Sequence, residues 1–146
     1  MTYIKDWIDI KELRLCNYVS FTDPSGKTCN MLVGGVTPDE ILLWLPSDVS
    51  PGDKVEVSNG ITIRGWQDGP EINPIPLTKE LVLKCGFEEE FGGIIYYNRN
   101  RGIEFNFSNG WCMASIGEYE ITSVKYLHQL QNLYFALTEE DLEINL

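Results

Sequence analysis

The chain has 146 residues, of which 43% are hydrophobic and 12% aromatic, so it is long enough to bury one full hydrophobic core or two small ones. Its 22 acidic residues outnumber 11 basic residues and give a formal net charge of −11. Because this charge repels phosphate backbones and anionic lipid surfaces, the composition argues against generic nucleic-acid binding.

The first ten residues do not have the pattern of a targeting signal. Lys5, Asp6 and Asp9 stand where a signal peptide would have its apolar core. No apolar run reaches the roughly 20 residues of a membrane-spanning helix. We therefore expect a soluble, cytoplasmic protein with no membrane partner.

Short β-strands are predicted in the first half of the chain, at residues 15–21, 28–33, 40–45, 54–57 and 61–66. Each is rich in β-branched or aromatic residues, and clusters of Pro, Gly, Asp and Asn separate them. Five strands in about fifty residues are typical of a small SH3-like β-barrel. We assign this barrel to residues 1–69.

Two Ser-Asn-Gly segments, at 58–60 and 108–110, predict β-hairpins. In the first hairpin, a two-residue Asn-Gly loop would put the two apolar rows on opposite faces. A three-residue loop with a left-handed glycine keeps them on one face. We choose the three-residue loop for both hairpins, which places Phe107 opposite Trp111 in the second one.

A segment with three prolines, at residues 70–76, marks the boundary between the halves. Proline donates no hydrogen bond to a β-ladder and holds the backbone extended. Just after it, Thr78 is predicted to cap a short helix that ends at Gly86. We assign residues 70–146 to a second, α+β subdomain.

The strongest helical pattern is at residues 124–137, whose apolar positions recur with helical spacing at Leu127, Leu130, Tyr134 and Leu137. The aromatic face of the hairpin at 103–113 needs a cover, and this helix is the long one available. The predicted fold is therefore α+β and mostly β. An N-terminal SH3-like small barrel is followed by an antiparallel sheet that the C-terminal helix covers.

Three segments carry a resemblance to a known family: 12–19, then 75–78 with 83–87, then the block Tyr-Leu-His-Gln-Leu-Gln-Asn-Leu-Tyr-Phe-Ala-Leu-Thr at 126–138. In this order and spacing they resemble a family of small proteins encoded by phages and prophages of gut bacteria. The resemblance implies no activity, cofactor or catalytic residue. The chain departs from the family in its extension at 1–10 and at Glu139, where the family often has glycine.

The candidate metal and catalytic residues do not form a convincing set. The four cysteines, Cys16, Cys29, Cys85 and Cys112, contain no Cys-x-x-Cys pair, so a zinc site is not expected and buried free thiols are the favoured interpretation. A Cys16–Cys29 disulfide across a hairpin is the alternative.

Other polar candidates also have simpler interpretations. We expect His128, the single histidine, on a polar helix face. We expect the run at 88–90 to be a solvated charge run. The acidic residues at 139–141 fit either a docking tail or, slightly better, the first turn of a helix capped by Thr138.

Two pairs of residues are the candidate binding sites. Arg99 and Arg101 lie at a predicted hairpin tip, where two guanidinium groups would grip phosphate or carboxylate. A polar turn chosen for its Asn and Gly is the competing interpretation. Arg64 and Trp66, which end the first hairpin, form a weaker pair that would stack on a planar ligand.

These features favour a protein that acts by binding, is not an enzyme and uses no cofactor. With the resemblance, they predict a phage-encoded accessory protein that blocks or sequesters a host protein, such as a factor of antiviral defence. Its contacts would be β-strand edges and the tip with Arg99 and Arg101, while the acidic surface would steer it toward a basic partner or imitate nucleic acid. The alternatives are a homo-oligomer that binds a small anionic ligand, such as a nucleotide signal, and a virion or assembly component.

Overall fold

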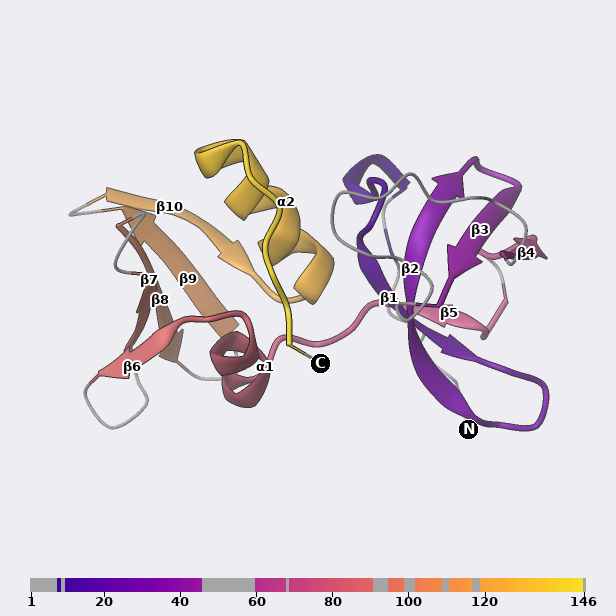
Figure 1. The fold of residues 1–146 in the computed structure, drawn as a ribbon, viewed down its shortest axis with the longest axis horizontal. Helices are drawn as coiled ribbons and strands as arrows, with labels where there is room; N and C mark the ends of the chain where they lie inside the picture. The colour runs from indigo at the N-terminus through magenta and orange to yellow at the C-terminus, as the bar shows by residue number, and fades with distance from the viewer. Residues whose placement is uncertain are drawn as a thin grey trace. The chain divides into compact units, whose positions relative to one another are not determined.

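The chain forms two compact units, Met1–Ile75 and Pro76–Leu146 (Figure 1). The computed structural model describes residues 8, 10–45, 60–67, 69–90, 95–98, 102–108, 111–116 and 119–145. Each unit contains one five-stranded antiparallel sheet. The fold is therefore α+β and mostly β, as predicted.

The first unit begins with a short 3-10 helix, η1 (Ile10–Glu12), and continues with five strands. The strands are β1 (Tyr18–Thr22), β2 (Thr28–Val36), β3 (Glu40–Trp44), β4 (Ile61–Arg64) and β5 (Ile72–Asn73). They pair in the order β4-β3-β2-β1-β5. Four of the five expected strands are therefore found. Those at 15–21, 28–33, 40–45 and 61–66 correspond to β1, β2, β3 and β4.

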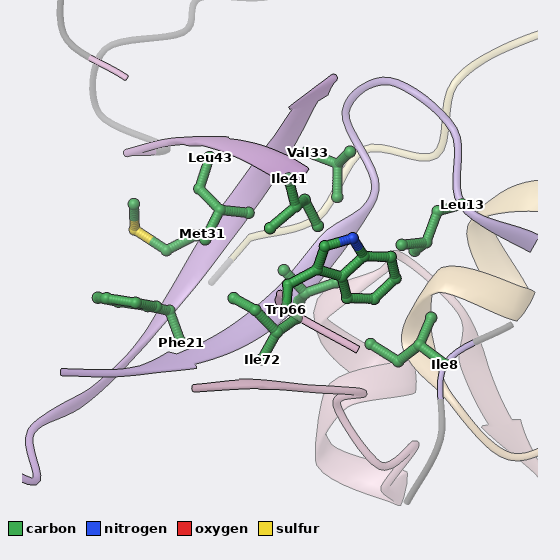
Figure 2. Close-up of a cluster of buried hydrophobic side chains, with 10 residues drawn as sticks. Ile8, Leu13, Phe21, Met31, Val33, Ile41, Leu43, Trp66 and Ile72 are labelled. Atoms are coloured by element: carbon green, nitrogen blue, oxygen red, sulfur yellow. The ribbon is translucent and has the colours of Figure 1, made fainter. Parts of the chain in front are cut away.

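The core of this unit lies on one face of the sheet, because buried and half-buried residues alternate along β1 and β3. Its buried side chains are Ile8, Leu13, Val19, Phe21, Met31, Val33, Ile41, Leu43, Trp66 and Ile72 (Figure 2). Trp66 is only 2% exposed, and its indole N–H donates to the Thr37 carbonyl at 2.9 Å. The polar edge of the ring is therefore satisfied inside the core.

A closed SH3-like barrel is not seen in the described part of the chain. The sheet is open there, since no pairing joins its outer strands β4 and β5. The fourth expected strand, at 54–57, lies outside the described residues. What is established is a five-stranded antiparallel sheet with a hydrophobic core on one face.

The proline-rich segment is not a pure linker. Ile72 and Asn73 form β5 and pair with β1, and Ile72 is 1% exposed. Flanking prolines at 70 and 74 keep this edge strand short. The division between the units therefore comes after Ile75, later than the boundary expected after residue 69.

The second unit contains two helices and five strands. They are α1 (Lys79–Lys84), β6 (Glu88–Glu90), β7 (Ile95–Asn98), β8 (Ile103–Ser108), β9 (Trp111–Ile116), β10 (Tyr119–Val124) and α2 (Leu127–Thr138). The strands form a meander, in the order β10-β9-β8-β7-β6. Figure 1 shows α1 and α2 on the same side of this sheet.

Helix α1 has the caps that its sequence predicts. The Thr78 hydroxyl accepts a hydrogen bond from the Leu81 N–H at 3.1 Å. After the helix, Gly86 takes a positive φ of 86°, and the Phe87 N–H donates to the Val82 carbonyl at 3.4 Å. A left-handed glycine therefore reverses the chain and returns Phe87 to the core, where it is 3% exposed.

Helix α2 begins later than predicted, because Val124 completes β10 and Tyr126 is the N-cap. The Gln129 side chain accepts hydrogen bonds from the N–H groups of Lys125 and Tyr126, at 2.9 and 3.2 Å. Leu127 and Leu130 are 0% exposed, as their helical spacing predicts, whereas Leu137 is 38% exposed.

Two expectations about α2 are wrong. His128 lies inside the fold, 0% exposed and stacked on Tyr126 with ring centroids 5.8 Å apart, and not on a polar face. Thr138 ends α2 and does not cap a following helix: its hydroxyl donates to the Tyr134 carbonyl at 2.7 Å. Glu139 then takes a left-handed φ of 59°, which explains why glycine suits this position.

The predicted register of the second hairpin is also wrong. Phe107 pairs with Cys112 and Phe105 with Ala114, so two residues, not three, separate the paired ends Ser108 and Trp111. This register puts small side chains opposite the phenylalanine rings, and Cys112 and Ala114 are 1% and 0% exposed. The register of this hairpin is therefore the one that pairs each phenylalanine with a small side chain, and not the one that pairs the most apolar residues.

The first Ser-Asn-Gly segment lies outside the described residues except for Gly60. The described glycines with a positive φ are Gly26, Gly65, Gly86 and Gly102. The left-handed conformation that we expect at Gly60 is therefore not found.

All four cysteines are free thiols, as expected, but only Cys85 and Cys112 are buried; Cys16 and Cys29 are half-buried. The alternative of a disulfide between Cys16 and Cys29 is wrong. Cys29 lies opposite Phe21 in the sheet, whereas the Cys16 N–H donates to the Val33 carbonyl at 2.8 Å.

Candidate binding surface

The second sheet has one covered face. Residues that pair directly on antiparallel strands point to the same side of a sheet. Tyr96 pairs with Phe105, and Phe105 pairs with Ala114. These three side chains are 1%, 1% and 0% exposed. This row therefore lies beneath the cover that α1, α2 and the adjoining chain supply.

Aromatic contacts join the covered face to its surroundings. The rings of Phe87 and Phe105 meet edge to face, with centroids 5.0 Å apart, and those of Tyr96 and Phe107 do so at 5.2 Å. Burial raises the pKa of Tyr96, and the nearby charges of Glu89 and Glu80 raise it further. The phenol therefore keeps its proton at neutral pH.

The residues between these positions point to the opposite side, which we call the open face. They form two rows of cross-strand pairs over all five strands. The first row is Glu88, Tyr97, Glu104, Ser115 and Glu120. The second row is Glu90, Ile95, Asn106, Met113 and Ser123. None of these residues is buried.

The open face is acidic at its exposed positions and apolar between them. Its four glutamates, Glu88, Glu90, Glu104 and Glu120, are exposed, while Ile95, Tyr97 and Met113 are half-buried. None of the ten positions of the two rows holds Lys or Arg. In the first row, glutamates recur at every second strand, a spacing of roughly 10 Å from the separation of neighbouring strands.

The two edges of this sheet differ in kind. β6 is short and consists of three exposed glutamates, which is a common way to prevent a sheet edge from pairing further. β10 is longer, and Tyr119 and Ile121 are 79% and 41% exposed. The register shifts between Glu120 and Thr122, which leaves Ile121 without a paired residue on β9.

The four residues predicted to bind a ligand are not brought together in the described part of the chain. Arg99 and Arg101 lie outside the described residues. Arg64 forms an ion pair with Glu40, with Nε 3.1 Å from the carboxylate oxygen. Trp66 belongs to the first core, so it lacks the free ring face that stacking on a ligand requires.

The remaining candidates have structural roles. Glu88–Glu90 is an exposed edge strand, as expected for a solvated charge run. Burial raises the pKa values of Cys85 and Cys112 to about 12, so both thiols stay protonated and are poor nucleophiles. The described residues contain no group of three or more side chains able to hold a metal ion.

The sequence of β8 indicates that one side of this strand is polar and belongs to an exposed face. Glu104 and Asn106 alternate with Phe105 and Phe107, which is the pattern of a strand with one wet face. What the alternation of one strand does not reveal is which strands lie side by side. That information comes from the register, which aligns Glu104 with Tyr97 and Ser115.

A scan of protein-family models, a search of curated proteins and a search of solved structures each found no match to this chain. Within the residues that the structure describes, no helix is long and apolar enough to cross a membrane. The fold and the surface define the class: a mostly-β α+β protein whose second sheet has one covered face and one open, acidic face.

Proposed function

We propose that this chain is a non-enzymatic, phage-encoded accessory protein that blocks or sequesters a host protein by binding it. The observation that supports binding is the open face, where four exposed glutamates surround half-buried Ile95, Tyr97 and Met113. The phage origin rests on the resemblance of segments 12–19, 75–78 with 83–87, and 126–138 alone. A factor of antiviral defence is the proposed type of target.

The chemistry of the open face favours a basic protein as the partner. Carboxylates attract Lys and Arg side chains over a distance and speed association, while half-buried apolar groups supply the area that excludes water. The same charges disfavour nucleic acid and anionic lipid. An acidic surface of this kind would occupy the site at which a host factor binds nucleic acid.

A non-catalytic role is supported by the state of two of the four cysteines and of the histidine. Cys85 and Cys112 are buried with raised pKa values, and His128 is buried against Tyr126. Catalysis by acid, base or nucleophile needs such groups at a surface that substrate reaches.

The first unit is proposed to be an SH3-like interaction module. Five antiparallel strands with a hydrophobic core on one face of the sheet support this assignment. In an SH3-like barrel the outer strands close on one another, so the assignment requires a further strand that joins β4 to β5. The strand expected at 54–57, which lies outside the described residues, is the candidate. Hydrogen exchange of that segment tests this proposal: slow exchange at 54–57 supports a fourth strand, and exchange at the rate of free peptide contradicts it.

The binding proposal is tested by charge reversal on the open face. We expect the double variant Glu104→Lys with Glu120→Lys to lose capture of its partner from phage-infected host lysate. Both glutamates are exposed, so the fold should keep its circular dichroism spectrum. The matched control is Glu139→Lys with Glu143→Lys, which reverses two exposed charges of the same unit away from the open face. Equal capture by both double variants contradicts the proposal.

The tip with Arg99 and Arg101 is tested in the same assay. If it grips an anionic partner, the double change Arg99→Ala with Arg101→Ala should abolish capture, since a desolvated charged contact contributes about 2 to 5 kcal/mol of affinity. Capture that survives this change but not the reversal of Glu104 and Glu120 assigns binding to the open face. The opposite result assigns it to the tip.

A further inference from the structure

Strand β10 differs from the other outer strands in the described part of the chain. It has six residues, whereas β4, β5 and β6 have four, two and three. β5 stands between two prolines and β6 is all glutamate, and both features prevent further pairing. β10 contains no proline, Lys or Arg.

The side chains of β10 are open to solvent over most of its length. All residues from Tyr119 to Ser123 are exposed, and only Val124 is buried. In the described part of the chain, β9 is its one neighbour in the sheet. The outer edge of β10 therefore presents backbone N–H and C=O groups beside exposed Tyr119 and Ile121.

Glu120 makes this edge favour a positively charged side chain on any strand that is added beside it. Its cross-strand neighbour on β9 is Ser115, and the row of the open face ends at Glu120. A strand added beside β10 would place one of its residues next to this carboxylate. A Lys or Arg there forms a favourable cross-strand pair, whereas Asp or Glu is repelled.

We propose that β10 is the docking edge for an extended segment of a partner protein, which adds to the sheet as a sixth strand. The segment alternates basic side chains, one of them beside Glu120, with apolar side chains that contact Tyr119 and Ile121. This inference rests on the proposed binding function and specifies the mode of binding and the partner's chemistry. Backbone hydrogen bonds supply affinity, and the alternating side chains supply specificity.

A second copy of the chain is a poorer occupant of the same edge. Each chain has a net charge of −11, and pairing two β10 strands brings two copies of Glu120 to one interface. Like charges at neighbouring positions of paired strands destabilise the pairing. The charge of the chain thus selects a basic partner over itself.

The probe for this proposal is a short synthetic peptide of alternating Lys and Val, capped at both ends. The control peptide has the same composition, with all Lys placed before all Val. We expect the alternating peptide to slow hydrogen exchange of the backbone amides of β10 in the full chain, and the control peptide to do so weakly. Equal protection by both peptides would mean unspecific attraction to an acidic protein and would overturn the proposal.

The key variant is Ile121→Pro. Ile121 has no paired residue on β9, so proline at this position removes no residue pair from the sheet. It does remove one backbone N–H and an exposed apolar side chain from β10, and proline disfavours pairing with an added strand. We expect binding of the alternating peptide to weaken at least about tenfold, because proline disrupts pairing along the edge and the apolar contact of Ile121 is lost. Ile121→Ala is the matched control, which keeps the N–H and is expected to bind more tightly than the proline variant.

Charge exchange provides a second variant that keeps the backbone intact. Glu120→Lys is expected to weaken the Lys-Val peptide about fivefold to tenfold, from the worth of a cross-strand ion pair. The same variant should bind a Glu-Val peptide better than the unchanged protein does. Failure of this exchange overturns the placement of a basic residue beside Glu120.

The outcomes separate this inference from the proposed function. If Ile121→Pro still captures the host partner while reversal of Glu104 and Glu120 abolishes capture, the binding function stands and strand addition at β10 is wrong. If sedimentation shows that the unchanged protein dimerises and Ile121→Pro makes it monomeric, a second copy occupies the edge, and the proposed partner chemistry is overturned.

Discussion

The two units use the same kind of sheet but cover it differently. In the described residues of the first unit, the cover includes Trp66, Ile8 and Leu13, which come from a turn after β4 and from the chain around η1. In the second unit, two helices and the chain that follows them supply the cover. Within the described residues of the first unit, Trp66 is the largest fully buried side chain of the core, and no α-helix contributes to the cover. We therefore expect the first core to depend more on a single residue.

The largest effect is expected from Trp66→Ala, which breaks the first cover at its biggest side chain. Removal of a buried Trp side chain typically costs about 3 to 5 kcal/mol. Hydrogen exchange should accelerate across residues 10–45 more than across α2. Leu15→Ala is the control, because Leu15 is 63% exposed and its truncation should be nearly neutral. Equal losses in both variants would refute the role of Trp66.

A smaller or similar effect is expected from Leu130→Ala in the second unit, at about 2 to 5 kcal/mol. Leu130 is 0% exposed, but Leu127 and Phe87 share the cover with it, so we expect a value in the lower half of that range. Chemical denaturation measures the loss. Leu137→Ala on the same helix is the control, since Leu137 is 38% exposed. If Leu130→Ala lowers the free energy of unfolding more than Trp66→Ala does, the first core does not depend more on a single residue than the second.

A stabilising change is expected from Glu139→Gly, because Glu139 ends α2 in a left-handed conformation that glycine adopts without steric cost. The gain should be up to about 1 kcal/mol in the free energy of unfolding of the second unit. Glu140→Gly, one residue further, should not stabilise. A variant Glu139→Gly that melts at or below the temperature of the unchanged protein contradicts the assignment of this cap.

The smallest effect on stability is expected from ionisation of Cys85 and Cys112 at alkaline pH. Both thiols belong to the second unit, so the effect should be confined to it. The pKa values of Cys85 and Cys112 rise from 9.0 to about 12 through burial. Their stability contribution is full below pH 9, where both states keep the proton, and is lost as the pH rises toward 12, because the unfolded thiols ionise first. Replacing both by Ala or Val should flatten the loss of stability of the second unit above pH 9. An unchanged alkaline slope would show that these thiols do not contribute to it.

Much of the fold was predictable because periodicity and capping are local signals. The strands at 28–33 and 40–45, the cap at Thr78 and the turn at Gly86 follow from residue types a few positions apart. The buried positions Leu127 and Leu130 were predictable for the same reason. Short-range rules reach this far because each depends on one element alone.

The failures come from size and from long-range pairing. Ranking residues by apolar character put Trp111 and Met113 in the covered row, whereas the structure buries Cys112 and Ala114, which leave room for Phe105 and its neighbours. Polarity alone likewise misplaced His128. The open face was beyond prediction because it needs the alignment of five strands, although Glu104 and Glu120 each carried the local pattern of a wet strand face.

The end of the second unit has a consequence for how the protein is made. After α2, Leu142 is buried at 9% exposure, and the Asn145 N–H donates to the Lys84 carbonyl at 2.9 Å. This bond joins positions about sixty residues apart, and contacts of such long range form late, because closing the loop costs chain entropy. The C-terminus of α1 therefore lacks this partner until residues 142–145 have left the ribosome. During that interval residues 1–75 are already synthesised, so we expect the second unit to complete its native contacts last.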